Sequence, residues 1–294
     1  DRLSRGLGDV YKRQIKNGYV IAERKKDKLN SINHKFPKIS VGATQNILMA
    51  STLADGISKL KNCAIEPEVI DLINFLNKCG ADIKVKNRTI TIKGVEELNL
   101  EDYKVIPDRI EAGSYILATM ATKGRLRLNN FNPNDLTFPL KIYQDMGLKI
   151  KKISKTSYEF YCKTLKPIKT ISTKEFPGYP TDLQAQLIAT QLKSALKSKV
   201  VENIFENRFI HIPELRRFGA NLSIIGKTVT IHKTLNLFGA EVMATDIRAS
   251  FSLIIAAMMS KGTTVINRIY HLDRGYEDFD LKLKKCGVNI SRKK

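Results

Sequence analysis

PDRIEAGSYILATMATKG, residues 107–124, places a short polar turn before a mostly apolar, Ala-rich helix that ends at a Lys-Gly pair. Three other segments repeat this pattern: SVGATQNILMASTLADG at 40–56, PTDLQAQLIATQLKSALKSK at 180–199 and ATDIRASFSLIIAAMMSKG at 244–262. A stretch with strand character follows each of them, namely SKLKNC, RLRLNNF, KVVENIF and TTVINRI. Self-similarity of this kind predicts a fold built from repeated units.

A second shared pattern lies further along each unit, where a helix ends in glycine and a strand begins. The four examples are LNKCGADIKV, YQDMGLKIKK, LRRFGANLSI and LKKCGVNISR, with glycines at 80, 147, 219 and 287. Glycine suits the position after a helix, where the backbone is left-handed. Apolar alternation around Asn-Arg in IKVKNRTITIKGV and around Gly-Lys in LSIIGKTVTIHKTL predicts paired strands.

Each unit is therefore predicted to run helix, strand, helix, strand, strand, which is an α/β fold. The helices that begin near Ala43, Ile110, Leu183 and Ile247 are apolar nearly all round. Helices of that kind are buried. We therefore expect the helices inside and the sheets outside, the reverse of a usual α/β barrel.

Composition indicates a globular chain. It has 294 residues, 43% of them hydrophobic, and no apolar run approaches the roughly 20 residues that a membrane span needs. The N-terminal DRLSRGLGDVYKRQ lacks the apolar centre of a signal peptide. The four cysteines lie far apart, without CxxC spacing, and the four histidines show no ligand spacing. These features predict a cytoplasmic protein that has no metal site and does not bind membranes.

The charge leaves two interpretations open. Fifty Lys and Arg residues against 29 Asp and Glu residues give a net charge of +21, which is compatible with nucleic-acid binding. The lysines are scattered, however, and there is no Trp and no RNA-binding aromatic motif. We favour a solvated surface that attracts small anions and expect no nucleic-acid partner.

Polar residues sit in the turns before the buried helices, and they also have two interpretations. Helix N-termini carry unpaired N–H groups that bind phosphates and carboxylates, and a neighbouring arginine adds two-pronged anion recognition. An Asp or Thr in such a turn is more often simply a helix cap. The turns concerned are 38–44, 107–109, 180–182 and 244–248, together with two polar stretches, 205–208 and 271–276.

Longer strings from these regions resemble the UDP-N-acetylglucosamine 1-carboxyvinyltransferases, a family of enolpyruvyl transferases. The strings in the second half are YPTDLQAQ, IFENRFIHIPELRRFGA, VMATDIRASFSLIIAA and VINRIYHLDRGYEDFDLKLKKCG. Those in the first half are ISVGATQNILMASTLADG, EPEVIDLINFLNKCGADI and YKVIPDRIEAGSYILA. The similarity runs almost continuously from Ile15 to the C-terminus, with the motifs in the same order.

The resemblance implies two similar domains, each an inside-out α/β barrel of three repeats. It implies that residues 15–106 are the second half of one domain and that residues 107–294 are most of the other, so that the first domain is incomplete. Residues 1–14 do not resemble the family and read like an artefact. The family's Lys-Asn pair and the loop with its proton-donating Cys or Asp would precede Ile15, so no proton donor is assigned to this chain. The chain alone is therefore expected to be inactive.

The resemblance also implies the reaction. Enolpyruvyl passes from phosphoenolpyruvate to the 3′-hydroxyl of UDP-N-acetylglucosamine and phosphate is released, with no metal and no cofactor. This is the first committed step of peptidoglycan synthesis, which links the enzyme to cell-wall biogenesis, cell shape and cell division. A monomer is expected.

Site residues are implied by their positions in the motifs. Asp182 matches the residue that binds the sugar hydroxyl and acts as base, and Arg274 matches an arginine that binds phosphoenolpyruvate. The UDP-sugar contacts match Lys38, Ile39, Ser40, Val41, Ile204 and Phe205. Arg208 and Arg248 match cleft residues that stabilise anions, and Asp246 matches one that positions its neighbours.

Two alternatives remain open. One is a nucleic-acid-binding α/β protein related to RNA terminal-phosphate cyclases, which have similar repeats. The other is a folded remnant without activity.

Overall fold

The computed structural model describes residues 11–16, 19–24, 28–194 and 196–293, so residues 1–10 of the segment set apart above lie outside it. The chain divides into two compact units, one ending at Ile106 and the other beginning at Pro107. Each unit is described by itself.

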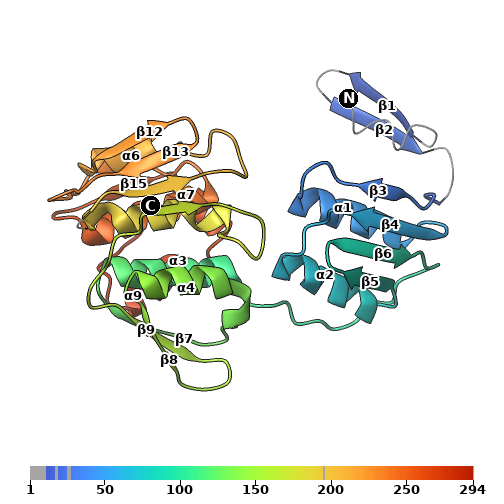
Figure 1. Cartoon of the computed structure of the whole chain (residues 1–294), viewed down its shortest axis with the longest axis horizontal. Helices are drawn as coiled ribbons and strands as arrows, with labels where there is room; N and C mark the ends of the chain where they lie inside the picture. Colours follow the sequence, from blue (N-terminus) through green and yellow to red (C-terminus); the bar gives the residue numbers. More distant parts are fainter. Residues whose placement is uncertain (1–10, 17–18, 25–27, 195, 294) are drawn as a thin grey trace. The chain divides into compact units, whose positions relative to one another are not determined.

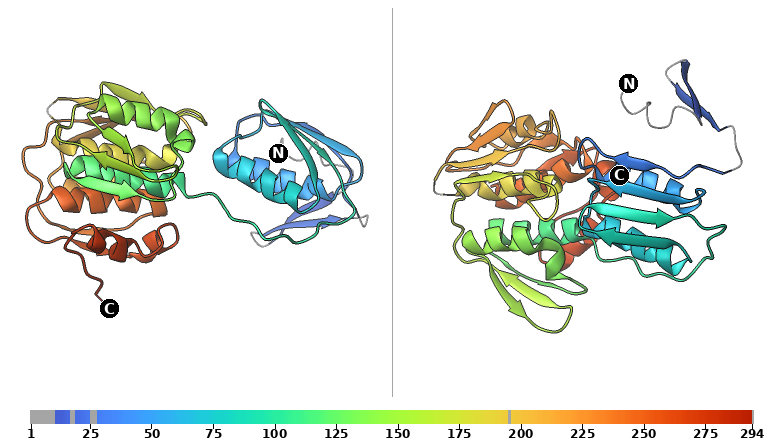
Figure 2. Two further views of the ribbon diagram at one scale, coloured as in Figure 1. Left: turned by 90° about the horizontal axis from the view of Figure 1, so that it is seen from below. Right: turned by 45° about the vertical axis from the view of Figure 1, so that its right-hand side comes forward.

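The first unit is a four-stranded sheet with two helices, and it also contains an antiparallel strand pair. The strand order in the sheet is β3-β4-β6-β5, and α1 and α2 lie against one face of it (Figures 1 and 2). The bounds are β1 (Tyr11–Lys16), β2 (Tyr19–Arg24), β3 (Asn33–Lys35), α1 (Val41–Thr52), β4 (Ile57–Lys61), α2 (Pro67–Lys78), β5 (Asp82–Lys86) and β6 (Thr89–Lys93). Leu48, Leu60, Ile73 and Ile90 belong to the core between helices and sheet.

The second unit surrounds three helices with sheets, and Figure 1 shows α3 and α7 between the sheet β7-β9-β8 and strands β12, β13 and β15. Its other sheets are β10-β11-β13-β12 and the pair β14-β15. Its first elements are α3 (Arg109–Ala121), β7 (Arg125–Leu128), η1 (Pro133–Leu136), α4 (Thr137–Asp145), β8 (Lys149–Lys152), β9 (Tyr158–Tyr161) and β10 (Thr170–Ser172). The next are η2 (Thr181–Leu183), α5 (Gln184–Thr190), η3 (Gln191–Lys193), β11 (Ser198–Val201), α6 (Ile212–Arg217), β12 (Leu222–Ile225) and β13 (Thr228–Ile231). The last are β14 (Glu241–Met243), α7 (Ile247–Met259), β15 (Val265–Asn267), α8 (Tyr270–Asp273) and α9 (Phe279–Lys285).

The predicted α/β fold with buried helices is confirmed in the second unit. Every residue of α5 is buried, as are most residues of α3 and α7, and α5 packs against both of the other helices. The order helix, strand, helix, strand, strand is also confirmed, as in α3-β7-α4-β8-β9. Apolar residues all round a helix therefore mark the centre of this unit.

The expectation that the helix near Ala43 is equally buried is wrong. In α1 only Thr44, Leu48, Ser51 and Thr52 are buried, and Met49 is 45% exposed. The reason is its surroundings, because α1 packs on one sheet and on α2, whereas α3, α5 and α7 also cover one another.

The four repeated glycines adopt the predicted left-handed backbone. Their φ angles are 102° at Gly80, 108° at Gly147, 88° at Gly219 and 90° at Gly287. A residue with a side chain is strained when its backbone is left-handed. Glycine is not, so it ends each helix and turns the chain away from the helix axis.

Three polar side chains form a buried cluster among the central helices, which we call the central triad: Ser114, Gln186 and Tyr276. The Ser114 and Tyr276 hydroxyls are 2.8 Å apart, and the Gln186 amide donates to both, over 3.1 and 3.2 Å. All three side chains are buried.

Among the described residues, no helix combines the length and the apolarity that a membrane span needs.

Candidate active site

Asp182 lies at the start of the central helix α5, within the short turn η2, and it does not cap the helix. Its Oδ1 forms an ion pair with Nη2 of Arg208, and its Oδ2 is 3.8 Å from Nε of Arg248. Its side chain is 38% exposed, so solvent and ligands can reach the carboxylate. The capping interpretation is therefore wrong for this residue, and the carboxylate instead bridges two cations.

Arg208 reaches Asp182 from the segment between β11 and α6. Its Nη1 donates to the Thr181 hydroxyl over 2.7 Å, and its guanidinium carbon lies 4.9 Å from the centre of the Phe205 ring. A guanidinium held by a hydroxyl, a carboxylate and an aromatic face has a fixed direction.

Arg248 lies in the first turn of α7, and Asp246 caps that turn. Oδ1 of Asp246 accepts hydrogen bonds from the backbone N–H groups of Arg248 and Ala249, each over 2.8 Å. The Arg248 guanidinium lies over the Tyr276 ring at 5.5 Å, and its Nη2 is 3.6 Å from Oδ2 of Asp108. For Asp246 the capping interpretation is thus correct.

The charge of Arg248 is stabilised by its neighbours. Burial alone would lower the pKa of Arg248, but Tyr276, Asp108 and Asp182 outweigh the burial and raise it. Arg248 is thus a permanent cation beside the Tyr276 ring, and its ion pairs with Asp108 and Asp182 are long. Because long ion pairs are weak, the guanidinium can bind a further anionic group.

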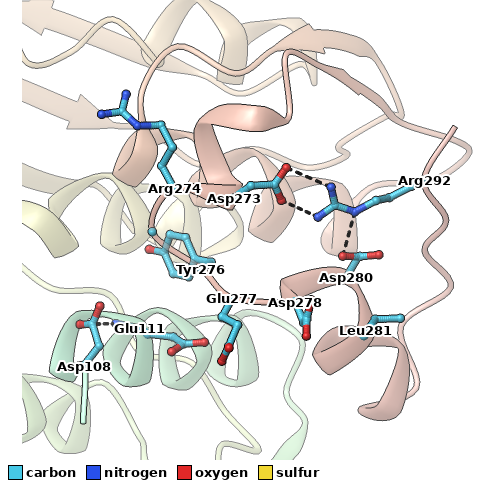
Figure 3. A pocket seen from close by; sticks show the side chains of 11 residues that line it. Asp108, Glu111, Asp273, Arg274, Tyr276, Glu277, Asp278, Asp280, Leu281 and Arg292 are labelled. Atoms are coloured by element: carbon cyan, nitrogen blue, oxygen red, sulfur yellow. Dashed lines mark hydrogen bonds and ion pairs between the residues drawn. The ribbon is translucent and has the colours of Figure 1, made fainter. Parts of the chain in front are cut away.

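Arg274 is exposed and lines a pocket of about 840 Å³ (Figure 3). Its guanidinium points away from Arg292, which pairs with Asp273 and Asp280. The pocket lining is mostly acidic, with Asp108, Glu111, Asp273, Glu277, Asp278 and Asp280. An acidic lining repels anions, so the pocket is not suited to phosphoenolpyruvate, and Arg274 points out of it.

The chain next to Arg274 approaches Arg248. A Cβ atom added to Gly275 would lie 3.7 Å from Nη1 of Arg248 and 2.3 Å from a methyl carbon of Ile247. Glycine is therefore required here for a close approach of the Arg274 segment to the first turn of α7.

The remaining predicted residues lie in two places. Ile204 is half-buried and Phe205 is exposed, and both follow β11 in the second unit. In the first unit, Lys38 is exposed, Ile39 and Val41 pack on the core, and Ser40 caps α1 by accepting from the Ala43 N–H over 3.3 Å. The geometry thus joins Asp182, Arg208, Arg248 and Phe205 in one cluster, with Asp246 and Arg274 beside it along the chain.

Four residues of this cluster were missed as site residues. They are Asp108, Thr181, Tyr276 and Glu202, whose Oε2 accepts a hydrogen bond from the Thr181 hydroxyl over 2.7 Å. The first two already stood in the turns before helices, and Tyr276 stood in the HLDRGYED string. Glu202 carried no signal, because an acidic residue after a strand is ordinary. No group of three or more His, Cys, Asp or Glu side chains with the arrangement of a metal site occurs in the part of the chain that the structure describes.

Known proteins resemble this chain over most of its length. The family model described as EPSP synthase (3-phosphoshikimate 1-carboxyvinyltransferase) matches residues 10–283, so the match begins inside the segment 1–14. The chain is 48% identical over 289 residues to a UDP-N-acetylglucosamine 1-carboxyvinyltransferase of Pelagibacter ubique, and the match covers 97% of this chain and 68% of the relative. The same enzyme of Bartonella tribocorum is 45% identical, with 95% and 65% covered. The chain thus spans about two thirds of the length of these relatives.

Solved structures show the same fold. The enolpyruvyl transferase NikO from Streptomyces tendae superposes with a TM-score of 0.85 at 23% identity, covering 98% of this chain and 72% of that one. EPSP synthase from Acinetobacter baumannii gives a TM-score of 0.71 at 15% identity, covering 97% and 69%.

Proposed function

The chain belongs to the EPSP synthase family of carboxyvinyltransferases, and we propose that the protein containing it carries out the reaction for which its curated relatives are named. Enolpyruvyl would pass from phosphoenolpyruvate to the 3′-hydroxyl of UDP-N-acetylglucosamine, with release of phosphate. Relatives at 44–48% identity over most of the chain support this choice of acceptor. They do not favour the nucleic-acid-binding alternative.

The observation that carries the proposal is the placement of Asp182 between two arginines. A carboxylate at a helix start that is not used as a cap is available to accept a proton. Arg208 and Arg248 beside it supply fixed positive charge where the anionic substrates would meet. Addition of a hydroxyl to phosphoenolpyruvate needs a base near the hydroxyl and cations near the phosphate and carboxylate, and this cluster offers both.

In the proposed addition, the acceptor oxygen bonds to C2 of phosphoenolpyruvate and its proton passes to the Asp182 carboxylate. The methylene carbon gains a proton from a group that is not assigned to this chain. In the elimination that follows, the C2–O bond to phosphate breaks and the methyl carbon loses a proton, which restores the vinyl group. Arg208 and Arg248 would stabilise the negative charge of the tetrahedral adduct.

The other predicted residues would bind the substrates. Arg274 would hold phosphoenolpyruvate, and Ile204 and Phe205 would contact the UDP-sugar. Lys38, Ile39, Ser40 and Val41 would hold the uridine and diphosphate through the lysine charge and the N–H groups of α1. Asp246 would position Arg248 by capping α7. This reaction would place a cytoplasmic, monomeric enzyme in peptidoglycan synthesis, and so in cell-wall biogenesis, cell shape and division.

The proposal is tested with the complete protein that contains this chain. Phosphate release from phosphoenolpyruvate should require UDP-N-acetylglucosamine and should not be supported by shikimate 3-phosphate, the acceptor of the other named branch. Release with shikimate 3-phosphate alone, or with neither acceptor, would exclude the proposed function.

A further inference from the structure

Glu202 is a buried carboxylate close to the proposed base. It follows β11 and is 2% exposed. Its Oε1 accepts from the N–H groups of Ile204 and Phe205, over 2.8 and 3.1 Å, and from the Thr173 hydroxyl over 3.0 Å. Its Oε2 accepts from the Thr181 hydroxyl over 2.7 Å. All four partners donate, so the buried charge is compensated by hydrogen bonds from neutral groups.

The Thr181 hydroxyl connects this carboxylate to Arg208. Because Thr181 gives its proton to Glu202, its oxygen lone pairs are free to accept the N–H of Arg208, as they do over 2.7 Å. The other guanidinium nitrogen of Arg208 pairs with Asp182. The hydrogen-bond direction is therefore fixed from Arg208 through Thr181 to Glu202.

We propose that Glu202 is a positioning residue that acts through Thr181 to orient the Arg208 guanidinium against Asp182. The same carboxylate accepts from the backbone N–H groups of Ile204 and Phe205, so one buried charge fixes both the hydrogen bond to Arg208 and the backbone that carries the Phe205 ring beside it. The consequence for turnover rests on the proposed function, whereas the orientation of Arg208 does not.

Glu202→Gln tests the hydrogen-bond direction with little change of shape. The amide nitrogen of the glutamine is itself a donor. It would face Thr181, because the opposite orientation would place it against the three donors that now bind Oε1, from Thr173, Ile204 and Phe205. It would then donate to Thr181, whose hydroxyl proton would lose its acceptor and rotate, so that the orientation in which Thr181 accepts from Arg208 would no longer be fixed. Thr181→Val removes the same link directly, and Thr181→Ser restores the hydroxyl.

The orientation of Arg208 can be measured without substrate on this chain. Side-chain ¹⁵N NMR should show separate, slowly exchanging Nη signals for Arg208 in the parent chain and in Thr181→Ser. Glu202→Gln and Thr181→Val should average them. Thr190→Val is the control, since it removes a threonine hydroxyl from α5, the helix that follows η2, but one that is bonded to backbone carbonyls. Unchanged Arg208 signals in Glu202→Gln would overturn the proposal.

Turnover of the complete protein gives the second measurement. Glu202→Gln and Thr181→Val should each lower kcat about 10- to 100-fold with little change in KM, as expected when a hydrogen bond to a charged group is lost. The double variant should be no worse than the poorer single one, because both changes break one connected path. Multiplied losses in the double variant, or normal turnover in Glu202→Gln, would contradict action through Thr181. If the parent protein releases no phosphate, the proposed function fails and the Arg208 signals alone decide the orientation.

Discussion

Asp182 forms an ion pair with Arg208 instead of capping the helix at whose start it lies. The aspartates at the matching positions of two other repeats, Asp108 and Asp246, do cap their helices. Of three turns with the same sequence pattern, two therefore use the carboxylate as a helix cap and one directs it at an arginine. The carboxylate that is not needed for helix stability is the one available for chemistry.

Asp182→Asn in the complete protein should lower turnover about 10²- to 10⁴-fold, because the side chain keeps its size but loses the proton acceptor. The fold and much of the UDP-sugar affinity should remain, as measured by thermal melting and calorimetry. If this variant turns over normally with both substrates saturating, the base must be another residue.

Arg274→Ala should raise the KM for phosphoenolpyruvate about 10- to 100-fold, with UDP-sugar binding unchanged. The reason is the loss of a charged hydrogen bond to one substrate. Arg292→Ala is the matched control, because Arg292 lines the same pocket but pairs with Asp273 and Asp280. It should change stability by less than about 1 kcal/mol and leave both KM values unchanged. Equal effects of the two variants would contradict a substrate role for Arg274.

Asp246→Ala should destabilise the chain by about 1 kcal/mol in a urea melt, because two N–H groups of α7 lose their acceptor. Asp246→Ser should recover most of that loss, since serine also caps helices. A serine variant as unstable as the alanine one would show that the carboxylate charge stabilises the site beyond capping.

His211 should make stability depend on pH. It is fully buried, neither ring nitrogen has a hydrogen-bond partner among the described residues, and burial together with the charge of Arg208 lowers its pKa from 6.5 to about 3. Between these values the unfolded chain binds a proton that the folded chain does not. The unfolding free energy should therefore fall as the pH drops from about 6.5 toward 3, by about 1.4 kcal/mol per pH unit from this group.

Urea melts at several pH values between 7.5 and 4.5 measure this slope. His211→Leu should reduce it, whatever its effect on stability at neutral pH. His271→Gln, which leaves His211 in place, should keep the full slope. An unchanged slope in His211→Leu would show that another group causes the pH dependence.

The repeats could be predicted because each depends on a local signal. Gly147 ends a helix in a left-handed conformation wherever that helix packs, and the apolar surface of α7 requires burial in any surroundings. The partial exposure of α1 could not be predicted, because burial of Met49 depends on which other helices surround it.

The site was predictable as a set of turns but not as a network. Asp182, Arg208 and Arg248 lie in three different segments of the chain, and the approach of Asp182 to Arg248 depends on how α5 and α7 pack together. No local sequence signal distinguishes an aspartate that caps a helix from one that faces two arginines. The buried charge of Glu202 was missed for the same reason, since its four donors come from positions 173, 181, 204 and 205.

The central triad has a consequence for how this protein can vary. Apolar neighbours in α3, α5 and α7 can exchange for one another with modest losses, because packing tolerates many shapes of similar volume. Ser114, Gln186 and Tyr276 cannot, because moving α3 or α5 by a single turn would take Ser114 or Gln186 away from both of its partners and leave polar groups without partners in an apolar interior. In a library that randomises the core, survivors should therefore diverge freely at the apolar positions and retain these three residues together or lose them together.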